Sequence, residues 1–288
     1  MQSGSVIDGK YRLDRELGAG GIGTVWSAWH ERLERHVAIK FLHHALDDRV
    51  RRRFAIEAHA LGRLNHPNCV KMYEFGYEPQ RRVLFLVMEH LVGRTLWELR
   101  GARTPLADIV EIAKQVATAL AYAHHQGVAH RDLKPENVML VQGHDGGVTV
   151  KVLDFGLALL ADTPDARVTR TGEVFGTPAY MSPEQVRGTR DAGPLSDLYS
   201  LGVMLYEMIE GRLPFEGNNA FDFFSGHVNE PVPPMRRPEA SPELVRIVNR
   251  LLQKRPENRF PSALALWQAL SALRLDPEDE SVRFVVIE

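Results

Sequence analysis

The sequence contains a single cysteine, has no long apolar run and carries almost no net charge. Because Cys69 is alone among the 288 residues, no internal disulfide can form, which fits a reducing compartment. A small buried apolar side chain is favoured over a reactive thiol here. The longest apolar stretches, around 83–88 and 198–209, are too short or too interrupted by charge to span a bilayer. We therefore expect a cytoplasmic protein, or the cytoplasmic domain of a longer membrane protein.

The charge balance also excludes some classes of partner. Lysine and arginine number 35 against 37 acidic residues, giving a net charge of −2. Nucleic acids and anionic membranes are usually bound through an overall positive field, which is missing here. A protein or small-molecule partner is favoured. An apolar fraction of 44% in 288 residues is ordinary for a globular chain with one large core or two lobes.

The chain divides into a strand-rich and a helix-rich part. Short β-type runs separated by turns fill the first ninety residues, at 11–17, 24–30, 36–42, 70–77 and 83–89. One helix is expected among them, from about Asp47 to Arg63. After Gly93 the spacing becomes helical, first from Leu106 to near Gly127 and later in an all-apolar helix at 198–209. The expected fold class is α+β, a small antiparallel sheet with one main helix and a larger, mostly helical second lobe.

Three glycines of the first lobe, Gly18, Gly20 and Gly23, follow the spacing G-x-G-x-x-G-x-V. Such glycines let a hairpin lie close over a triphosphate and direct backbone N–H groups at its oxygens. The pattern alone is weak. A dinucleotide-binding fold would continue into a helix, whereas Thr24–His30 is strand-like. This context favours a flap over nucleotide phosphates.

Lys40 lies in the strand-like run Val37-Ala38-Ile39-Lys40, among apolar neighbours. An ammonium group there is costly to desolvate unless it has anionic partners. Nucleotide phosphates and a carboxylate would serve, and Glu57 on the expected helix is the candidate carboxylate. Taken alone, Lys40 would instead be interpreted as a surface lysine whose stem lies along apolar surface.

The most informative segment is His130-Arg131-Asp132-Leu133-Lys134-Pro135-Glu136-Asn137. Asp132 can accept a hydroxyl proton, Lys134 can neutralise a transferring phosphoryl group and Asn137 offers an oxygen to Mg²⁺. The run Asp154-Phe155-Gly156 then supplies a hard oxygen ligand. Both strings in this order do not arise by chance.

Together these segments resemble a protein kinase catalytic domain, with the bacterial eukaryotic-like (Hanks-type) serine/threonine kinases as the closest match in character. The resemblance covers roughly residues 11–270. It implies the bilobal protein kinase fold, with a kinase domain at 11–275 whose lobes are 11–91 and 92–275. Residues 1–10 are then an N-terminal extension and 276–288 an acidic tail.

The resemblance implies that ATP contacts the glycine-rich turn, the sheet and the connection between the lobes. The implied nucleotide-binding residues are Leu17, Gly18, Ala19, Gly20, Gly21, Ile22, Gly23, Val25, Ala38, Lys40, Met88, Glu89, Leu91 and Met139. In this set the backbones of Glu89 and Leu91 would bind adenine, and Met88 would be the gatekeeper. The ring would lie between Val25, Ala38 and Met139.

The resemblance further implies structural roles outside the reaction. Glu184, in a Ser-Pro-Glu run where the family usually has Ala-Pro-Glu, would pair with Arg259. Asp197 would brace the catalytic loop from the start of the buried helix. His130 would pack and form hydrogen bonds within that loop.

The implied reaction is transfer of the γ-phosphoryl group of ATP to serine or threonine hydroxyls of protein substrates. Asp132 would deprotonate the acceptor and Lys134 would contact the γ-phosphate. Lys40 would hold the α- and β-phosphates and would itself be held by Glu57. Lys134, two residues after Asp132, points to serine and threonine acceptors instead of tyrosine.

Two Mg²⁺ ions are implied, held by Asn137 and Asp154. Two other classes of function compete with this interpretation. A pseudokinase would keep the fold without the chemistry, but every catalytic position is intact, and ATP turnover with Mg²⁺ separates the two. A small-molecule phosphotransferase should lack the long peptide-recognising segment from Asp154 to Glu184 that this chain has.

Activation by autophosphorylation is expected at Thr169, Thr171 or both. Arg131 precedes the catalytic aspartate and needs an anionic partner, which a phosphothreonine would supply. The alternative is that both threonines are merely exposed loop residues. Thr177 is a poorer candidate, because the family uses this threonine to contact the catalytic loop. The expected partners are protein substrates and a second copy of the kinase, met in trans in a transient homodimer.

Overall fold

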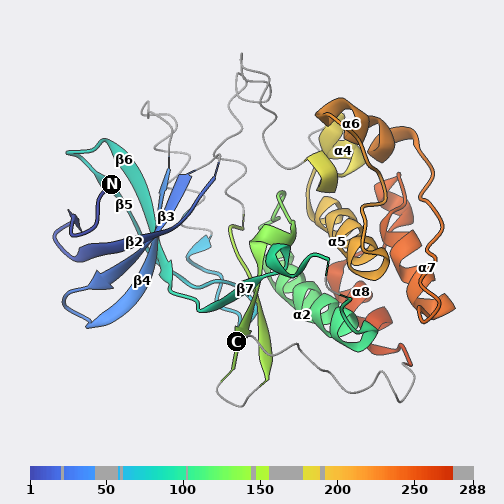
Figure 1. Cartoon of the computed structure of the whole chain (residues 1–288), viewed down its shortest axis with the longest axis horizontal. Helices are drawn as coiled ribbons and strands as arrows, with labels where there is room; N and C mark the ends of the chain where they lie inside the picture. The colour runs from blue at the N-terminus through green and yellow to red at the C-terminus, as the bar shows by residue number, and fades with distance from the viewer. Residues whose placement is uncertain are drawn as a thin grey trace.

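A computed structural model describes residues 1–20, 23–42, 58, 61–101, 103–143, 147–155, 178–188 and 192–274. Within these residues the chain forms two lobes, a sheet built from its first third and a mostly helical body built from the rest (Figure 1). This is the expected α+β class. The expected helix from 47 to 63 lies mainly outside the described residues, and so do residues 276–288.

The first lobe is a six-stranded antiparallel sheet in the order β1-β2-β3-β4-β6-β5. Its strands are β1 (Val6–Ile7), β2 (Tyr11–Ala19), β3 (Gly23–His30), β4 (Arg35–Leu42), β5 (Met72–Glu78) and β6 (Val83–Glu89). All five expected runs are strands, with ends shifted by two residues at most. The sequence patterns did not point to β1, in which Val6 and Ile7 pair with Arg12 and Tyr11.

Alternation along β4 gives the sheet two different faces. Val37, Ile39 and Phe41 are buried in an apolar cluster on one face, which also holds Ile7 of β1. Lys40, between Ile39 and Phe41, must therefore lie on the opposite face. The sheet thus keeps its own small core on one side and presents its nucleotide-binding candidates on the other.

A second, three-stranded sheet follows the boundary between the lobes. Its strands are β7 (Gly93–Thr95), β8 (Val138–Gln142) and β9 (Val148–Val152), in that order. The expectation that strands end near Gly93 was therefore wrong. Gly93 is the first residue of β7, and only glycine fits there, because a Cβ would lie 2.0 Å from the carbonyl oxygen of Leu140 on β8. The glycine permits a close approach of two strands and does not mark a turn.

Helices make up the remainder of the second lobe. They are α2 (Leu106–His125), α4 (Pro183–Val186), α5 (Pro194–Glu210), α6 (Ala220–Asn229), α7 (Pro242–Leu251) and α8 (Ala263–Ser271). Short 3₁₀ turns join them: η1 (Trp97–Leu99), η2 (Pro135–Asn137), η3 (Pro178–Tyr180) and η4 (Pro256–Asn258).

The two helices expected from the sequence, α2 and α5, form the centre of this lobe. Most residues of both helices are buried, and their apolar side chains belong to the main apolar cluster. Each is followed by a glycine with positive φ, Gly127 at 77° and Gly211 at 72°, a conformation that favours glycine and ends a helix. Across the described ranges, no helix is both long and apolar enough to cross a bilayer.

Candidate active site

The first turn of α5 holds the catalytic loop, residues 130–137, through Asp197. The carboxylate of Asp197 accepts hydrogen bonds from the backbone N–H groups of His130 (2.8 Å) and Arg131 (2.7 Å). His124 at the end of α2 lies 2.7 Å from the same carboxylate. The expected bracing role of Asp197 is therefore what the geometry shows, and His124 is a second contact that the sequence did not reveal.

Arg131 adopts a backbone conformation that is unusual for a long side chain, with φ of 65°. Its two backbone polar groups are both fixed, the N–H by Asp197 and the carbonyl by the amide of Gln185, 2.7 Å away. Strained residues of this kind persist where surrounding contacts over-determine them, commonly at functional sites. No sequence signal pointed to Gln185, which directly follows Glu184 on α4.

Asp132, the expected base, contacts two other expected site residues of its own loop, Lys134 and Asn137. Its carboxylate is 2.9 Å from the ammonium group of Lys134. The amide nitrogen of Asn137 donates to the carbonyl oxygen of Asp132 at 2.7 Å. The side chains of Asp132 and Lys134 are about one-fifth exposed, so a substrate hydroxyl can reach them. His130 lies beneath, where its Nε2 is 2.7 Å from the carbonyl oxygen of Leu153.

Lys40 and Asp154 connect the two lobes. The ammonium group of Lys40 is 2.5 Å from a carboxylate oxygen of Asp154, and the lysine is 6% exposed. Asp154 has a φ of 54°, a left-handed conformation that aspartate tolerates better than most residues. The expected partner Glu57 lies outside the described residues. Asp154 is thus the anionic partner of Lys40 in the described part of the chain.

Strand register places the expected adenine-binding residues on one face of the first sheet. Val25 lies opposite Lys40 across β3 and β4, and Ala38 lies opposite Met88 across β4 and β6. Ala38 and Lys40 are two residues apart, so their side chains point to the same side of the sheet. Met139 comes from the other lobe, on β8 between Thr95 and Lys151.

The connection between the lobes begins at Glu89, whose side chain contacts Lys71 and Lys151. One carboxylate oxygen accepts from the backbone N–H of Lys71 (2.7 Å) and lies 2.8 Å from the ammonium group of Lys151. The backbone N–H of Glu89 donates to the carbonyl of Lys71 at 2.9 Å. If the backbone of Glu89 binds adenine, it must therefore use its carbonyl. Leu91 follows in the connection, partly exposed.

The glycine-rich turn closes the hairpin between β2 and β3. Gly20 and Gly23 exchange backbone hydrogen bonds of 2.9 and 3.2 Å. A Cβ on Gly23 would lie 2.0 Å from the carbonyl oxygen of Phe41, so the hairpin needs glycine to lie against β4. Leu17, Gly18 and Ala19 lead into the turn and are exposed, whereas Gly21 and Ile22 lie outside the described residues.

A small apolar cavity lies beside Met88 and Asp154. It has a volume of about 30 Å³ and is lined by Leu61, Leu64, Val70, Met72, Leu86, Met88, Asp154 and Phe155. Its lining joins Met88, the expected gatekeeper, to Asp154, the expected metal ligand. A cavity of this size has room for little more than one or two water molecules.

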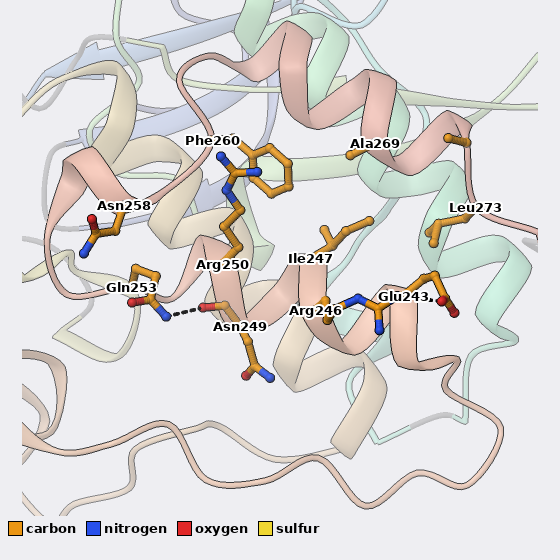
Figure 2. A pocket seen from close by; sticks show the side chains of 11 residues that line it. Glu243, Arg246, Ile247, Asn249, Arg250, Gln253, Asn258, Phe260, Ala269 and Leu273 are labelled. Carbon is orange, nitrogen blue, oxygen red and sulfur yellow. Dashed lines mark hydrogen bonds and ion pairs between the residues drawn. The ribbon is translucent and has the colours of Figure 1, made fainter.

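A much larger groove, of about 700 Å³, lies between α7 and α8 (Figure 2). It is lined by Ile247, Phe260 and Leu273 together with polar and charged side chains. The guanidinium of Arg250 covers the ring of Phe260 at 4.4 Å. None of the sequence-predicted site residues lines this groove, so volume alone does not locate the chemistry.

The segment 178–186, which contains η3 and α4, contacts the second lobe at several points. Tyr180 donates through its hydroxyl to Glu207 of α5 at 2.6 Å, and Ser200 donates to the carbonyl of Tyr180 at 2.8 Å. Glu184 forms the expected pair with Arg259, through two contacts of 2.7 and 2.9 Å. Burial opposes ionisation of Glu184, but Arg259 outweighs it and holds the pKa of that carboxyl below its ordinary value.

Comparison with known proteins decides the family, because the model of the protein kinase domain matches residues 11–270. The chain belongs to the protein kinase family. The kinase domain is 43% identical over 280 residues to serine/threonine-protein kinase pkn3 of Myxococcus xanthus, covering 94% of this chain and 51% of that protein. It is 37% identical to PknA of Mycobacterium tuberculosis, covering 94% of this chain and 63% of that protein. The chain thus spans between half and two thirds of these relatives.

Solved structures agree with the fold. A double mutant of the PknI kinase domain from Mycobacterium tuberculosis matches with a TM-score of 0.73 and 27% identity, over 94% of this chain and 98% of that one. The expected resemblance to bacterial serine/threonine kinases and the expected bilobal fold are both confirmed. Residues 11–270 are a protein kinase domain, and the family implies ATP, a divalent metal and protein substrates.

Proposed function

We propose that this domain transfers the γ-phosphoryl group of ATP to serine and threonine hydroxyls of protein substrates, with Asp132 as the base. The observation that carries the proposal is the contact of Asp132 with Lys134 at 2.9 Å, in a loop held by Asp197. The carboxylate takes the hydroxyl proton as the acceptor oxygen bonds to the γ-phosphorus. The bond to the bridging oxygen then breaks and ADP leaves.

Lys134 and Lys40 supply positive charge where the phosphates lie. Lys134, beside Asp132, neutralises charge on the transferring group, and Lys40 holds the α- and β-phosphates. Positioned charges of this kind act strongly because a partly buried site is poor in water, and Lys40 is 6% exposed. Glu57 is proposed as the residue that holds Lys40 in the active kinase.

The donor set suits Mg²⁺, which prefers hard oxygens and usually takes only one or two protein carboxylates beside phosphates. Asp154 supplies a carboxylate, and Asn137 has its amide nitrogen engaged by Asp132, so its oxygen is the atom proposed as ligand. No three histidine, cysteine or acidic side chains gather into a metal-holding group within the described ranges. When bound, Mg²⁺ would neutralise phosphate charge.

The remaining contacts of the nucleotide are proposed from the common face of the first sheet. Val25 and Ala38 from the sheet, with Met139 from β8, enclose adenine. The carbonyl of Glu89 and the backbone of Leu91 bind its edge. Leu17 to Gly23 cover the phosphates through the glycine-rich hairpin, whose closed turn is fixed by the Gly20 and Gly23 bonds.

We further propose that the domain activates itself by phosphorylation of Thr169 or Thr171, which lie outside the described residues. The support is Arg131, whose Nε is buried and has no hydrogen-bond partner in the described part of the chain. A phosphothreonine carries about −1.5 to −2 charges and would satisfy this guanidinium. The domain would act in the cytoplasm, by itself or as part of a longer membrane protein.

Two experiments test these proposals. Purified chain with Mg²⁺ and labelled ATP should phosphorylate serine or threonine in peptides, and ATP binding without any transfer would identify a pseudokinase instead. Mass spectrometry should find phosphate on Thr169 or Thr171 of the wild type and none on Asp132→Asn expressed alone. Wild-type kinase added to Asp132→Asn should then phosphorylate it, which would demonstrate transfer in trans. Absence of phosphate from both threonines in an active wild type would refute self-activation at these sites.

A further inference from the structure

His227 connects α6 to η3, at the start of the segment 178–186. The side chain is fully buried. Its Nε2 lies 3.0 Å from the carbonyl oxygen of Ala179 on η3, and its Nδ1 lies 2.9 Å from the hydroxyl of Tyr199 on α5. One imidazole ring therefore connects three elements of the second lobe through directional contacts.

The chemistry of the two partners fixes the direction of both hydrogen bonds. A carbonyl oxygen only accepts, so Nε2 of His227 must carry the proton that it donates to Ala179. Burial, aided by the charge of Lys254, lowers the pKa of His227 to about 4, and the ring is neutral near pH 7. Nδ1 is then an acceptor, and Tyr199, whose pKa burial raises, donates to it. Tyr199 thus selects the tautomer that can hold Ala179.

The ring has little freedom to turn away from this arrangement. The aromatic ring of Phe215 meets it edge-on, with centroids 5.1 Å apart. Lys254 donates to the carbonyls of Gly226 and His227, both at 2.8 Å. A Cβ on Gly226 would lie 2.7 Å from the Cβ of Phe215, so α6 lies against this aromatic ring as closely as a helix can.

The segment that contains Ala179 also contacts the catalytic loop. Ala179 belongs to the segment Pro178–Val186, whose Gln185 donates to the carbonyl of Arg131 at 2.7 Å. Arg131 directly precedes the proposed base. A shift of this segment would therefore move the backbone beside the acceptor hydroxyl. Among the described residues, Lys40 forms its ion pair with Asp154 and not with this segment.

We propose that His227 is a positioning residue for the protein substrate, which fixes the backbone at Ala179 so that the segment Pro178–Val186 receives the acceptor peptide. This inference rests on the proposed function, because it requires a protein substrate whose hydroxyl reaches Asp132. The residue acts on peptide affinity and leaves ATP binding alone. Tyr199 acts through it, by holding the tautomer.

Conservative variants separate the donor from the bulk of the ring. A glutamine amide reaches as far as Nε2 of histidine, whereas an asparagine amide reaches only as far as Nδ1. His227→Gln can therefore keep the bond to Ala179, and His227→Asn cannot. Tyr199→Phe removes the hydroxyl that selects the tautomer. Tyr206→Phe is the matched control, because this buried tyrosine of the same helix has a hydroxyl without a hydrogen-bond partner in the described ranges.

The experiment measures steady-state kinetics of the 288-residue chain with a serine peptide that the wild type phosphorylates, selected from a degenerate peptide array. Loss of one such bond should raise the peptide KM of His227→Asn about three- to tenfold, with the KM for ATP unchanged. His227→Gln should restore the peptide KM to within about twofold, Tyr199→Phe should be intermediate, and Tyr206→Phe should match the wild type.

Two outcomes would overturn the inference. The first is an unchanged peptide KM in both His227→Asn and Tyr199→Phe. The second is that His227→Asn and His227→Gln lose kcat to the same extent and lose thermal stability to the same extent, which indicates a role in folding alone. If His227→Asn does not fold, the comparison of Tyr199→Phe with Tyr206→Phe decides. A wild type that phosphorylates no peptide contradicts the proposed function instead, so the two failures are distinguishable.

Discussion

Arg259 forms a bidentate pair with the carboxylate of Glu184, with contacts of 2.7 and 2.9 Å, and neither residue is more than 4% exposed. The same guanidinium also donates to the carbonyl of Leu195 at the start of α5. The pair therefore fixes α4 to the start of α5, through a buried contact.

Breaking this pair should cost much more than breaking a surface pair. We predict that Arg259→Met lowers the free energy of unfolding by about 3–5 kcal/mol, because the carboxylate of Glu184 stays buried and loses the positive charge of the guanidinium. Urea unfolding measures the loss. Arg246→Ala is the control, since its pair with Glu243 has both side chains more than half exposed and should matter by less than about 1 kcal/mol. Similar losses in the two variants would contradict the prediction.

Replacing Lys40 or Asp132 should lower the rate of phosphoryl transfer and leave the fold intact. We predict that Lys40→Met and Asp132→Asn each lower kcat by about 10²–10³ or more, because each removes a group that acts on the transition state. Circular dichroism should remain that of the wild type. Lys71→Met changes an exposed lysine of the same lobe and should leave turnover unaltered. Turnover near the wild-type rate in either variant would refute the assignment.

Lys40 contacts Asp154, and its proposed catalytic partner is Glu57. If pairing with Glu57 switches the kinase on, Glu57→Gln should lower kcat by about tenfold or more and change ATP affinity by less than about threefold. Nucleotide binding by calorimetry and kcat with a peptide are the two measurements. Equal losses of affinity and turnover would indicate that the pair is only structural.

The N-terminal strand should contribute to the stability of the first lobe. Ile7 is fully buried against Tyr11 and Leu13, whereas its neighbour Val6 is 48% exposed. Ile7→Ala should therefore lower the free energy of unfolding by about 2–4 kcal/mol, and Val6→Ala should change it by less than about 0.5 kcal/mol. Thermal unfolding of both variants checks this difference. A similar small loss in both would mean that β1 is dispensable.

The lowered pKa of His227 should make the free energy of unfolding depend on pH. Its pKa is about 4 in the folded state against an ordinary value of 6.5, so the unfolded chain takes up the proton first on acidification. Stability should fall as the pH drops from about 6.5 towards 4, by about 2 kcal/mol at pH 5 from this residue. Lys254 is the charged neighbour, and Tyr199 and Phe215 face the ring. Urea unfolding at pH 7.5 and 5 should show a smaller difference for His227→Gln than for the wild type.

Sequence patterns predicted the features that depend on local chemistry. The five long strands, α2 and α5 follow from alternation and helical spacing. Gly93 shows where such patterns are ambiguous, because a glycine that ends one element and a glycine that lets two strands touch look the same. The strands β8 and β9 depend on pairing with distant residues, which local spacing does not contain.

The supporting contacts of the site were less accessible from sequence for the same reason. Gln185, His124 and His227 lie 54, 73 and 48 residues from the groups that they hold. Their roles arise from the packing of α4, α2 and α6 around α5, which brings ordinary polar side chains to particular backbone atoms. Glu184 and Arg259 could be anticipated only because the family resemblance supplied their pairing.

The single thiol offers a practical advantage for measuring lobe motion. Cys69 is 1% exposed, and burial raises the pKa of its thiol to about 12, so a native kinase should hardly react with maleimides. Cysteines placed at the exposed positions Leu33 and Phe221, one on each lobe, would then be the reactive ones. A fluorophore pair at these two sites could follow opening and closing in solution without first removing the natural cysteine.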